Sequence, residues 1–336
     1  MRRPSLALSL IIIFLAGCGQ TTEGGQQTTD HRPSPTVNDQ TSTVSSQLPT
    51  QSPTPLAPTP TPTPLPCNPL TGYCVEDGHF FLYRPISLPG TITIDQGYPY
   101  GSTERGTRVP HHGVEFYNAS GTPVLAAADG LVVVAGNDSG TIYGPQPNFY
   151  GNLIVLEHLF SGIDQPVFTL YGHLSKVDVK TGQTVRSGDK IGEVGSTGFA
   201  IGSHLHFEVR LGKNDYDSNR NPVLWLKPLT GQDGNSFGVI AGRLVNAQGK
   251  LIHATDVNIQ YFPDLNGPQA AAYQVETYAP EQSPVNGDDD WNENFTMGDL
   301  PAGNYRISLM WGGKVYDHWI VVMPGNVTFV VFQIDQ

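Results

Sequence analysis

Short apolar runs broken by Gly, Pro and Asn dominate the chain from about residue 67 onward. No long stretch there repeats its apolar residues at the 3.6-residue spacing of an amphipathic helix. Runs typical of strands lie at 124–127, 131–135, 153–156, 167–171 and 205–209. This pattern predicts an all-β domain over residues 67–231.

A second set of strand-like runs follows a polar, Gly-containing stretch at 230–236. Its members lie at 239–245, 257–262, 304–310, 315–322 and 327–334. Even spacing with turns between the runs predicts an antiparallel β-sandwich domain over residues 237–336. The pattern resembles the immunoglobulin-like or carboxypeptidase-regulatory-like modules of extracellular enzymes.

The start of the chain indicates export. Arg2 and Arg3 precede an apolar run at 7–15, which is too short to span a bilayer but fits a secretory signal peptide over residues 1–18. The following Leu15-Ala16-Gly17-Cys18 resembles the bacterial lipobox. That resemblance implies cleavage before Cys18, lipidation of Cys18 and anchoring to the cell membrane on its outer side; cleavage elsewhere is the alternative.

Residues 19–66 are mostly Thr, Ser, Gln and Pro, and they end in a Pro-Thr alternation at 58–64. Their few aromatic and branched apolar residues cannot bury enough surface to fold, so we expect a disordered linker, stiffened toward polyproline near its end. Fully extended at about 3.1 Å per residue, such a linker reaches on the order of 150 Å.

Two cysteines, Cys67 and Cys74, lie close together with turn residues between them. Outside the cytoplasm such a pair predicts a disulfide, and closing so small a loop contributes about 2.5 kcal/mol in the chain-entropy model. A two-cysteine metal site is the alternative, but no nearby Cys or His supplies a second pair.

The net charge of the chain is −12. Proteins that bind nucleic acid present basic patches, so an acidic chain of this kind argues against a nucleic-acid partner. Nothing in the composition indicates an oligomeric state.

The strongest chemical signal is the run Ser-His-Leu-His-Phe-Glu-Val-Arg at 203–210. Because side chains alternate along a strand, His204, His206 and Glu208 share one face, and the apolar residues between them share the other. A solvent-exposed polar face is the alternative interpretation if the chain offers no further metal ligand.

The segment at 111–115 offers such ligands in His111 and Glu115. Zinc requires bonds of about 2.0 to 2.2 Å to imidazole nitrogen and carboxylate oxygen. A straight strand would separate the two Cα atoms by roughly 13 Å, so we expect the chain to bend between them at Gly113.

A third segment ends in His173, after a strand-like run and before a Gly-rich stretch. These three segments, with the text at 121–130, 179–185 and 221–222, resemble the lysostaphin-type zinc endopeptidases over about residues 105–228. The resemblance implies an antiparallel, barrel-sandwich-like β-sheet fold and one Zn²⁺ per chain.

The same resemblance implies roles for individual residues. His111 and His206 match the family's zinc ligands, Glu115 stands where the family has an aspartate ligand, and His173 and His204 match its catalytic histidines. One of these two would be the general base and the other the donor to the oxyanion, in an order that stays open. The extra methylene of Glu115 displaces the carboxylate by on the order of 1.5 Å, a shift that matters in a catalytic site.

The implied activity is hydrolysis of peptide bonds in peptidoglycan stems or cross-bridges. A catalytically inactive relative that binds wall peptide or activates another wall hydrolase is the main alternative. A lipoyl- or biotinyl-type carrier domain would need an acceptor lysine in a hairpin turn, and neither Lys180 nor Lys190 stands in such a context.

Overall fold

The computed structural model describes residues 67–231, 237–281 and 284–335. The predicted signal peptide, the lipidation at Cys18 and the linker at 19–66 lie outside these residues. The regular secondary structure of the described residues is almost entirely strand, which confirms the all-β prediction. The helices among these residues are two short 3-10 turns, η1 (Tyr216–Ser218) and η2 (Pro222–Leu224). Among the described residues, no helix has the length and apolar character needed to cross a membrane.

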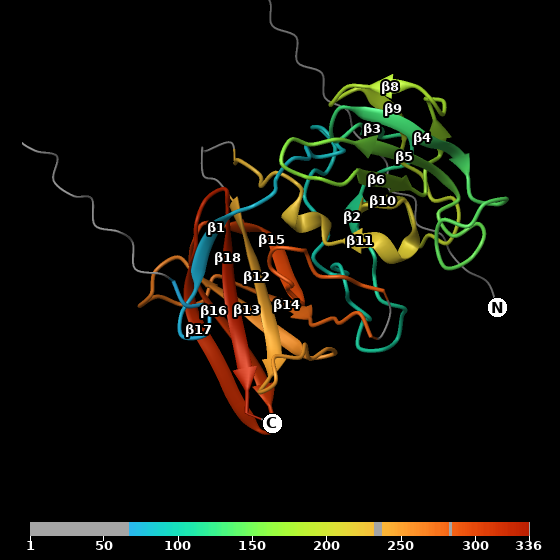
Figure 1. The fold of residues 1–336 in the computed structure, drawn as a ribbon. Coiled ribbons are helices and arrows are strands. Elements are labelled where there is room, and N and C mark those ends of the chain that lie inside the picture. Colours follow the sequence, from blue (N-terminus) through green and yellow to red (C-terminus); the bar gives the residue numbers. More distant parts are fainter. Residues whose placement is uncertain (1–66, 232–236, 282–283, 336) are drawn as a thin grey trace, which may run out of the picture. The chain divides into compact units, whose positions relative to one another are not determined.

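A seven-stranded antiparallel sheet forms the centre of the first predicted domain (Figure 1). Its strands are β2 (Val114–Tyr117), β4 (Gly130–Asn137), β5 (Asn152–His158), β6 (Val167–Gly172), β8 (Thr184–Val185), β10 (His204–Leu211) and β11 (Asn219–Arg220). Every residue of β10 is buried, and this strand pairs with β2, β6 and β11. A three-stranded sheet of β3 (Pro123–Leu125), β7 (Lys176–Val177) and β9 (Lys190–Glu193) completes this region.

The second predicted domain is a sandwich of two four-stranded sheets. One sheet contains β1 (Cys74–Asp77), β12 (Phe237–Asn246), β15 (Phe295–Pro301) and β18 (Asn326–Ile334). The other contains β13 (Asp256–Phe262), β14 (Ala271–Glu276), β16 (Gly303–Trp311) and β17 (Lys314–Val322). Both sheets contribute buried residues to one apolar cluster, such as Leu244 from the first and Ile307 from the second.

The prediction of a wholly antiparallel sandwich is wrong, because residues 239–246 of β12 pair in parallel with residues 327–334 of β18. A parallel pair cannot be closed by a tight hairpin and needs a long connection. Here the whole of the other sheet, together with β15, lies between the two strands in the sequence.

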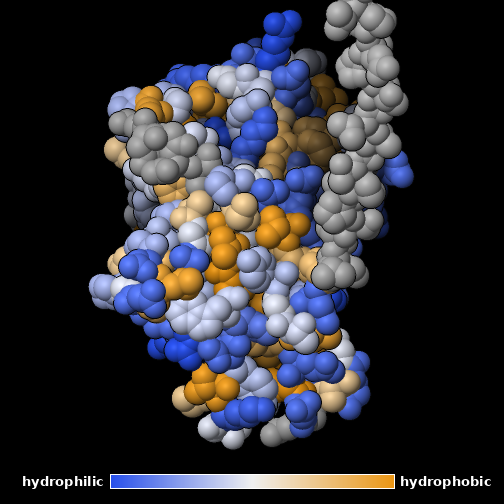
Figure 2. Space-filling view, turned by 90° about the vertical axis from the view of Figure 1, so that its left-hand side faces the viewer, coloured by the Kyte–Doolittle hydropathy of each residue, from blue (hydrophilic) through white to orange (hydrophobic). Residues whose placement is uncertain are grey.

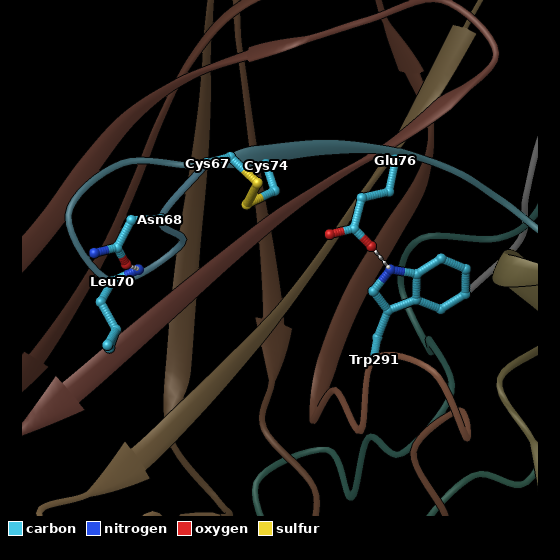
Figure 3. The surroundings of a disulfide bond; sticks show 6 residues. All are labelled: Cys67, Asn68, Leu70, Cys74, Glu76 and Trp291. Atoms are coloured by element: carbon cyan, nitrogen blue, oxygen red, sulfur yellow. Dashed lines mark hydrogen bonds between the residues drawn. A yellow bond between two sulfur atoms is a disulfide. The ribbon is translucent and has the colours of Figure 1, made fainter. Parts of the chain in front are cut away.

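The strand that follows the cysteines belongs to the sandwich. Strand β1 pairs antiparallel with β18, so residues 74–77 form the sandwich edge instead of the start of the first domain. Cys67 and Cys74 are joined in a disulfide beside this edge, and Trp291 donates from Nε1 to Glu76 Oε2 at 2.7 Å (Figure 3). The first domain is therefore inserted between two strands of the sandwich sheet.

The two halves also share an apolar core. Along β12, Ile240 and Leu244 lie in the sandwich core, whereas Val239 and Ala241 lie in a cluster that includes Trp225 from the other half. The period-2 alternation of a strand thus directs one face of the sheet to each core. On the face drawn in Figure 2, hydrophobic residues appear in small groups among hydrophilic ones.

Candidate metal and catalytic site

Three side chains predicted to bind metal converge at one point. Glu115 on β2 lies directly opposite His206 on β10, and His111 precedes β2. Glu115 Oε1 is 2.9 Å from both His111 Nε2 and His206 Nδ1, and the two nitrogens are 3.4 Å apart. All three residues are buried. The longer side chain of Glu115 therefore still brings an oxygen to the two imidazoles.

Each of the two imidazoles is oriented through its other nitrogen. His111 Nδ1 donates to the Tyr98 carbonyl at 2.8 Å, and its ring stacks on that of Tyr98 with centroids 4.1 Å apart. His206 Nε2 donates to Glu208 Oε1 at 3.0 Å. In the neutral rings these contacts leave the lone pairs of His111 Nε2 and His206 Nδ1 directed at Glu115, the arrangement that metal-binding histidines adopt.

The donor set fits a zinc ion. Two imidazole nitrogens and one carboxylate oxygen are typical zinc ligands, and three protein ligands leave a position for water or substrate. Glu115 Oε2 is buried and has no hydrogen-bond partner among the described residues, although it lies 3.3 Å from His204 Nε2. A buried carboxylate oxygen without a hydrogen bond is energetically costly, and a bound cation would offset that cost.

The electrostatics of the site favour positive charge. Burial raises the pKa of Glu115, but His206 and His111 outweigh burial and hold that pKa well below its usual range. Burial lowers the pKa of His206, yet Glu115 and Glu208 raise it to about 10. A bound metal cation would supply at Nδ1 of His206 the charge that a proton otherwise supplies.

A buried network behind His206 was not predicted as part of the site. Glu208 accepts from Arg210 Nε at 2.8 Å and from the Tyr150 hydroxyl at 2.5 Å, and the pKa of Glu208 is lowered despite burial, chiefly by Arg210. Side-chain alternation along β10 places Glu208 on the same face as His206. Tyr150 lies in the loop before β5, and no pattern in the sequence indicates that it belongs to the site.

The two predicted catalytic histidines lie beside the predicted metal ligands. Their ring centroids are 4.8 Å apart, and that of His173 is 5.6 Å from His206. His173 Nδ1 donates to the Thr197 carbonyl at 2.9 Å and His204 Nδ1 to that of Gly202 at 3.2 Å. Both contacts leave Nε2 unprotonated in the neutral ring.

Both histidines are neutral near pH 7. Burial lowers the pKa of His173 to about 4, with His206 adding to the effect, and burial also lowers the pKa of His204. His173 has a φ of 62°, the left-handed region that a non-glycine residue occupies only when its surroundings hold it there. Its backbone N–H donates to the Tyr150 carbonyl at 2.9 Å.

These residues line a cavity of about 440 Å³. Its rim carries exposed apolar side chains, namely those of Val109, Tyr117, Phe199 and Ile201. The site therefore opens to solvent through an apolar rim, while the ligand residues themselves stay buried.

Position 113 requires glycine because the surrounding atoms leave no space for a side chain. A Cβ atom there would lie 2.6 Å from the Phe207 carbonyl oxygen and 2.8 Å from the His206 ring. The φ of Gly113 lies outside the left-handed region that favours glycine. The predicted bend therefore does not require the conformational freedom of glycine. The absent side chain instead lets the chain cross β10 close to His206.

Two further histidines and the two cysteines of the described chain lie outside this cluster. His158 is buried, with Nδ1 donating to the Asp129 carbonyl at 2.7 Å and Nε2 2.8 Å from Thr169 Oγ1, and so serves as an ordinary core residue. The sulfurs of Cys67 and Cys74 are bonded to each other, which leaves no thiolate for a metal. His79, which the sequence gives no reason to single out, contacts Asp288 at 2.9 Å.

Comparison with known proteins agrees with this geometry. The model of peptidase family M23 matches residues 109–219. Peptidoglycan DD-endopeptidase ShyB of Vibrio cholerae is 35% identical over 180 residues, which are 50% of this chain and 39% of the relative. Glycyl-glycine endopeptidase ALE-1 of Staphylococcus capitis is 37% identical over 172 residues, covering 51% and 44%.

Among solved structures, a zinc-containing peptidase from Vibrio cholerae is 33% identical, covers 42% of this chain and 38% of its own, and superposes with a TM-score of 0.32. The chain spans less than half the length of each of these relatives. The matched segment contains all five site residues, namely His111, Glu115, His173, His204 and His206. Residues 109–219 of this chain are therefore similar to the domains of peptidase family M23.

Proposed function

We propose that this protein is a zinc-dependent endopeptidase that hydrolyses peptide bonds in peptidoglycan stem peptides or cross-bridges. The observation that carries the proposal is the convergence of His111 Nε2, Glu115 Oε1 and His206 Nδ1, with His173 and His204 beside them in one cavity. Three ligands and two further imidazoles supply both a metal site and proton carriers.

The substrate class rests on the relatives. Their names specify a DD-peptide bond in one case and a glycyl-glycine bond in the other. The open, apolar-rimmed cavity leaves room for an extended peptide. The proposal therefore names the polymer and leaves the bond to experiment.

The residues of the chain suit acid–base work on a peptide bond. A zinc ion in the site would polarise the scissile carbonyl and acidify the attacking water. His204 and His173, neutral at pH 7 with Nε2 unprotonated, can each accept a proton from water at that atom and return it to the leaving amine. The backbone carbonyls of Thr197 and Gly202 hold the rings so that Nε2 faces the cavity.

We further propose that the enzyme works outside the cytoplasmic membrane, anchored by lipid on Cys18. The motif at 15–18 and the Pro- and Thr-rich composition of 19–66 support this placement. A peptidoglycan substrate requires an extracytoplasmic site, so the localisation and the substrate are consistent with each other.

A catalytically silent wall-binding protein is the second candidate, because Glu115 replaces the aspartate that the family resemblance leads us to expect. One experiment separates the two. The zinc content and the wall-digesting activity of the chain are measured for wild type, His204→Ala and Glu115→Asp.

Stoichiometric zinc with activity that is lost in His204→Ala supports the peptidase. Wild type that is inert and is activated by Glu115→Asp supports the silent protein. Absence of zinc from wild type and from both variants contradicts the proposed function.

A further inference from the structure

The segment that leads into His111 is held by the sandwich. Glu276, the last residue of β14, is buried and accepts from the Thr103 backbone N–H at 2.8 Å and from Thr103 Oγ1 at 2.6 Å. Its Oε2 also receives the Arg105 backbone N–H at 3.4 Å. One carboxylate of the sandwich thus collects three donors from this segment.

The backbone of this segment adopts a conformation that is unfavourable unless neighbouring residues stabilise it. Glu104, Arg105 and Gly106 have φ values of 47°, 59° and 79° in succession, and the first two lack the freedom of glycine. Non-glycine residues in this region cost on the order of 1–3 kcal/mol each and persist where neighbours fix them. Successive N–H groups in such a turn form a concave anion site, and the Glu276 carboxylate occupies it.

This turn is connected to the metal ligand by backbone hydrogen bonds. The His111 N–H donates to the Ser102 carbonyl at 3.0 Å, and Gly101 donates back to the His111 carbonyl at 2.8 Å. Arg108 donates to the Thr103 carbonyl at 2.9 Å. The orientation of His111 is thereby tied to the turn that Glu276 holds.

A second contact with the sandwich lies on the same segment. The rings of Tyr100 and Tyr278 meet edge to face with centroids 5.2 Å apart, and the Tyr100 hydroxyl donates to the Asn286 carbonyl at 2.8 Å. Gly101 lies so close to Tyr278 that a Cβ would be 2.2 Å from its ring. The segment is therefore seated on the sandwich on both sides of Ser102.

We propose that Glu276 is a positioning residue, through which the sandwich orders the Thr103–Gly106 turn and so sets His111 for metal binding. This inference rests on the proposed function for the role of the metal. It assigns to the sandwich a part in assembling the zinc site itself.

The test compares Glu276→Ala with Glu276→Gln, which keeps an acceptor oxygen, and with Asp256→Asn as the control. Asp256 pairs with the Arg105 side chain at 3.3 Å but is 40% exposed, so its loss should have little effect. Amide hydrogen exchange of the metal-free chain, zinc affinity by chelator competition, and thermal unfolding are measured for each.

We expect Glu276→Ala to speed amide exchange over residues 103–111 and to weaken zinc binding roughly 10-fold, the scale seen when a group orienting a metal ligand is removed. Glu276→Gln should fall between Ala and wild type, and Asp256→Asn should match wild type. A folded Glu276→Ala with wild-type exchange and zinc affinity overturns the proposal.

If Glu276→Ala does not unfold cooperatively, the proposal is tested with Thr103→Val instead. This variant removes only the hydrogen bonds that Thr103 Oγ1 makes with Glu276 and Gly106. Wild-type exchange and affinity in that variant overturn the proposal, and faster exchange with weaker binding supports it. If wild type itself binds no zinc, the proposed function fails, whereas the exchange of the metal-free chain still shows whether Glu276 orders the turn.

Discussion

The Nε2 atom of His206 lies 3.0 Å from Oε1 of Glu208, two residues further along β10. Because both side chains are buried on one face of the strand, the carboxylate fixes which nitrogen of the imidazole carries the proton. The lone pair of Nδ1, the proposed ligand atom, is thus directed by a residue that would not touch the metal.

Replacing Glu208 should therefore weaken zinc binding. We expect Glu208→Ala to lower zinc affinity roughly 10- to 100-fold. It should also destabilise the fold by about 3–5 kcal/mol, because buried Arg210 loses its partner. Glu208→Gln, which keeps an acceptor, should lose less of both. Chelator competition and denaturant unfolding measure these effects, and unchanged affinity in Glu208→Ala would contradict the role.

Gly113→Ala should disturb the site from the backbone side. The added methyl would meet the Phe207 carbonyl oxygen at 2.6 Å, so we expect a loss of about 1–3 kcal/mol of unfolding free energy and reduced zinc content. Gly140→Ala is the matched control, since a Cβ there meets nothing within 4 Å. Equal stability and zinc content in the two variants would refute the close-approach argument.

Stability should fall between mildly acidic and mildly basic pH because of Glu293. Burial, reinforced by Asp288, raises the pKa of this carboxyl to about 8, against about 4.3 in the unfolded chain. The folded state therefore holds a proton that the unfolded state has lost across that window. The contribution of Glu293 to the unfolding free energy declines by up to about 1.4 kcal/mol per pH unit and levels off above pH 8.

Glu293→Gln should remove this decline, so its stability relative to wild type should grow from pH 5 to pH 8. Unfolding in denaturant at pH 5, 7 and 9 measures the difference. The exposed Glu281→Gln serves as the control and should leave the pH dependence as in wild type. Parallel stability curves for wild type and Glu293→Gln would show that this carboxyl is ionised in the folded protein.

Removing the disulfide should affect stability and leave the metal site intact. We expect the double variant Cys67→Ser, Cys74→Ser to lose about 2.5 kcal/mol of unfolding free energy, the value for a loop of this size. The bridge lies beside β1 in the sandwich, away from the proposed zinc ligands, so zinc content should stay at the wild-type level. Loss of zinc in a folded double variant would contradict this separation.

Local sequence patterns predicted most of the strands that carry the site. The alternation at 203–210 gave β10 with its histidines on one face, and the residues of the family resemblance gave His111, Glu115 and His173. The strand alternation and the short motifs involve residues that are close together in the sequence. They can therefore be recognised without knowledge of the tertiary structure.

The features that were not predicted depend on partners far away in the sequence. Strand β15 contains Gly298 and Asp299 and has weak strand character, yet it pairs with β12. Strand β1 gains its place only from β18, more than two hundred residues later. Tyr150 and Glu276 reach their partners through the tertiary fold, so no local pattern marks them.

The insertion of the first domain between β1 and β12 predicts how the protein unfolds on heating. Two covalent crossings and one continuous apolar core join the halves, so neither can lose its structure without exposing buried residues of the other, such as Trp225 and Val239. Heating should consequently produce one endothermic transition whose calorimetric and van't Hoff enthalpies agree, as for a single cooperative domain.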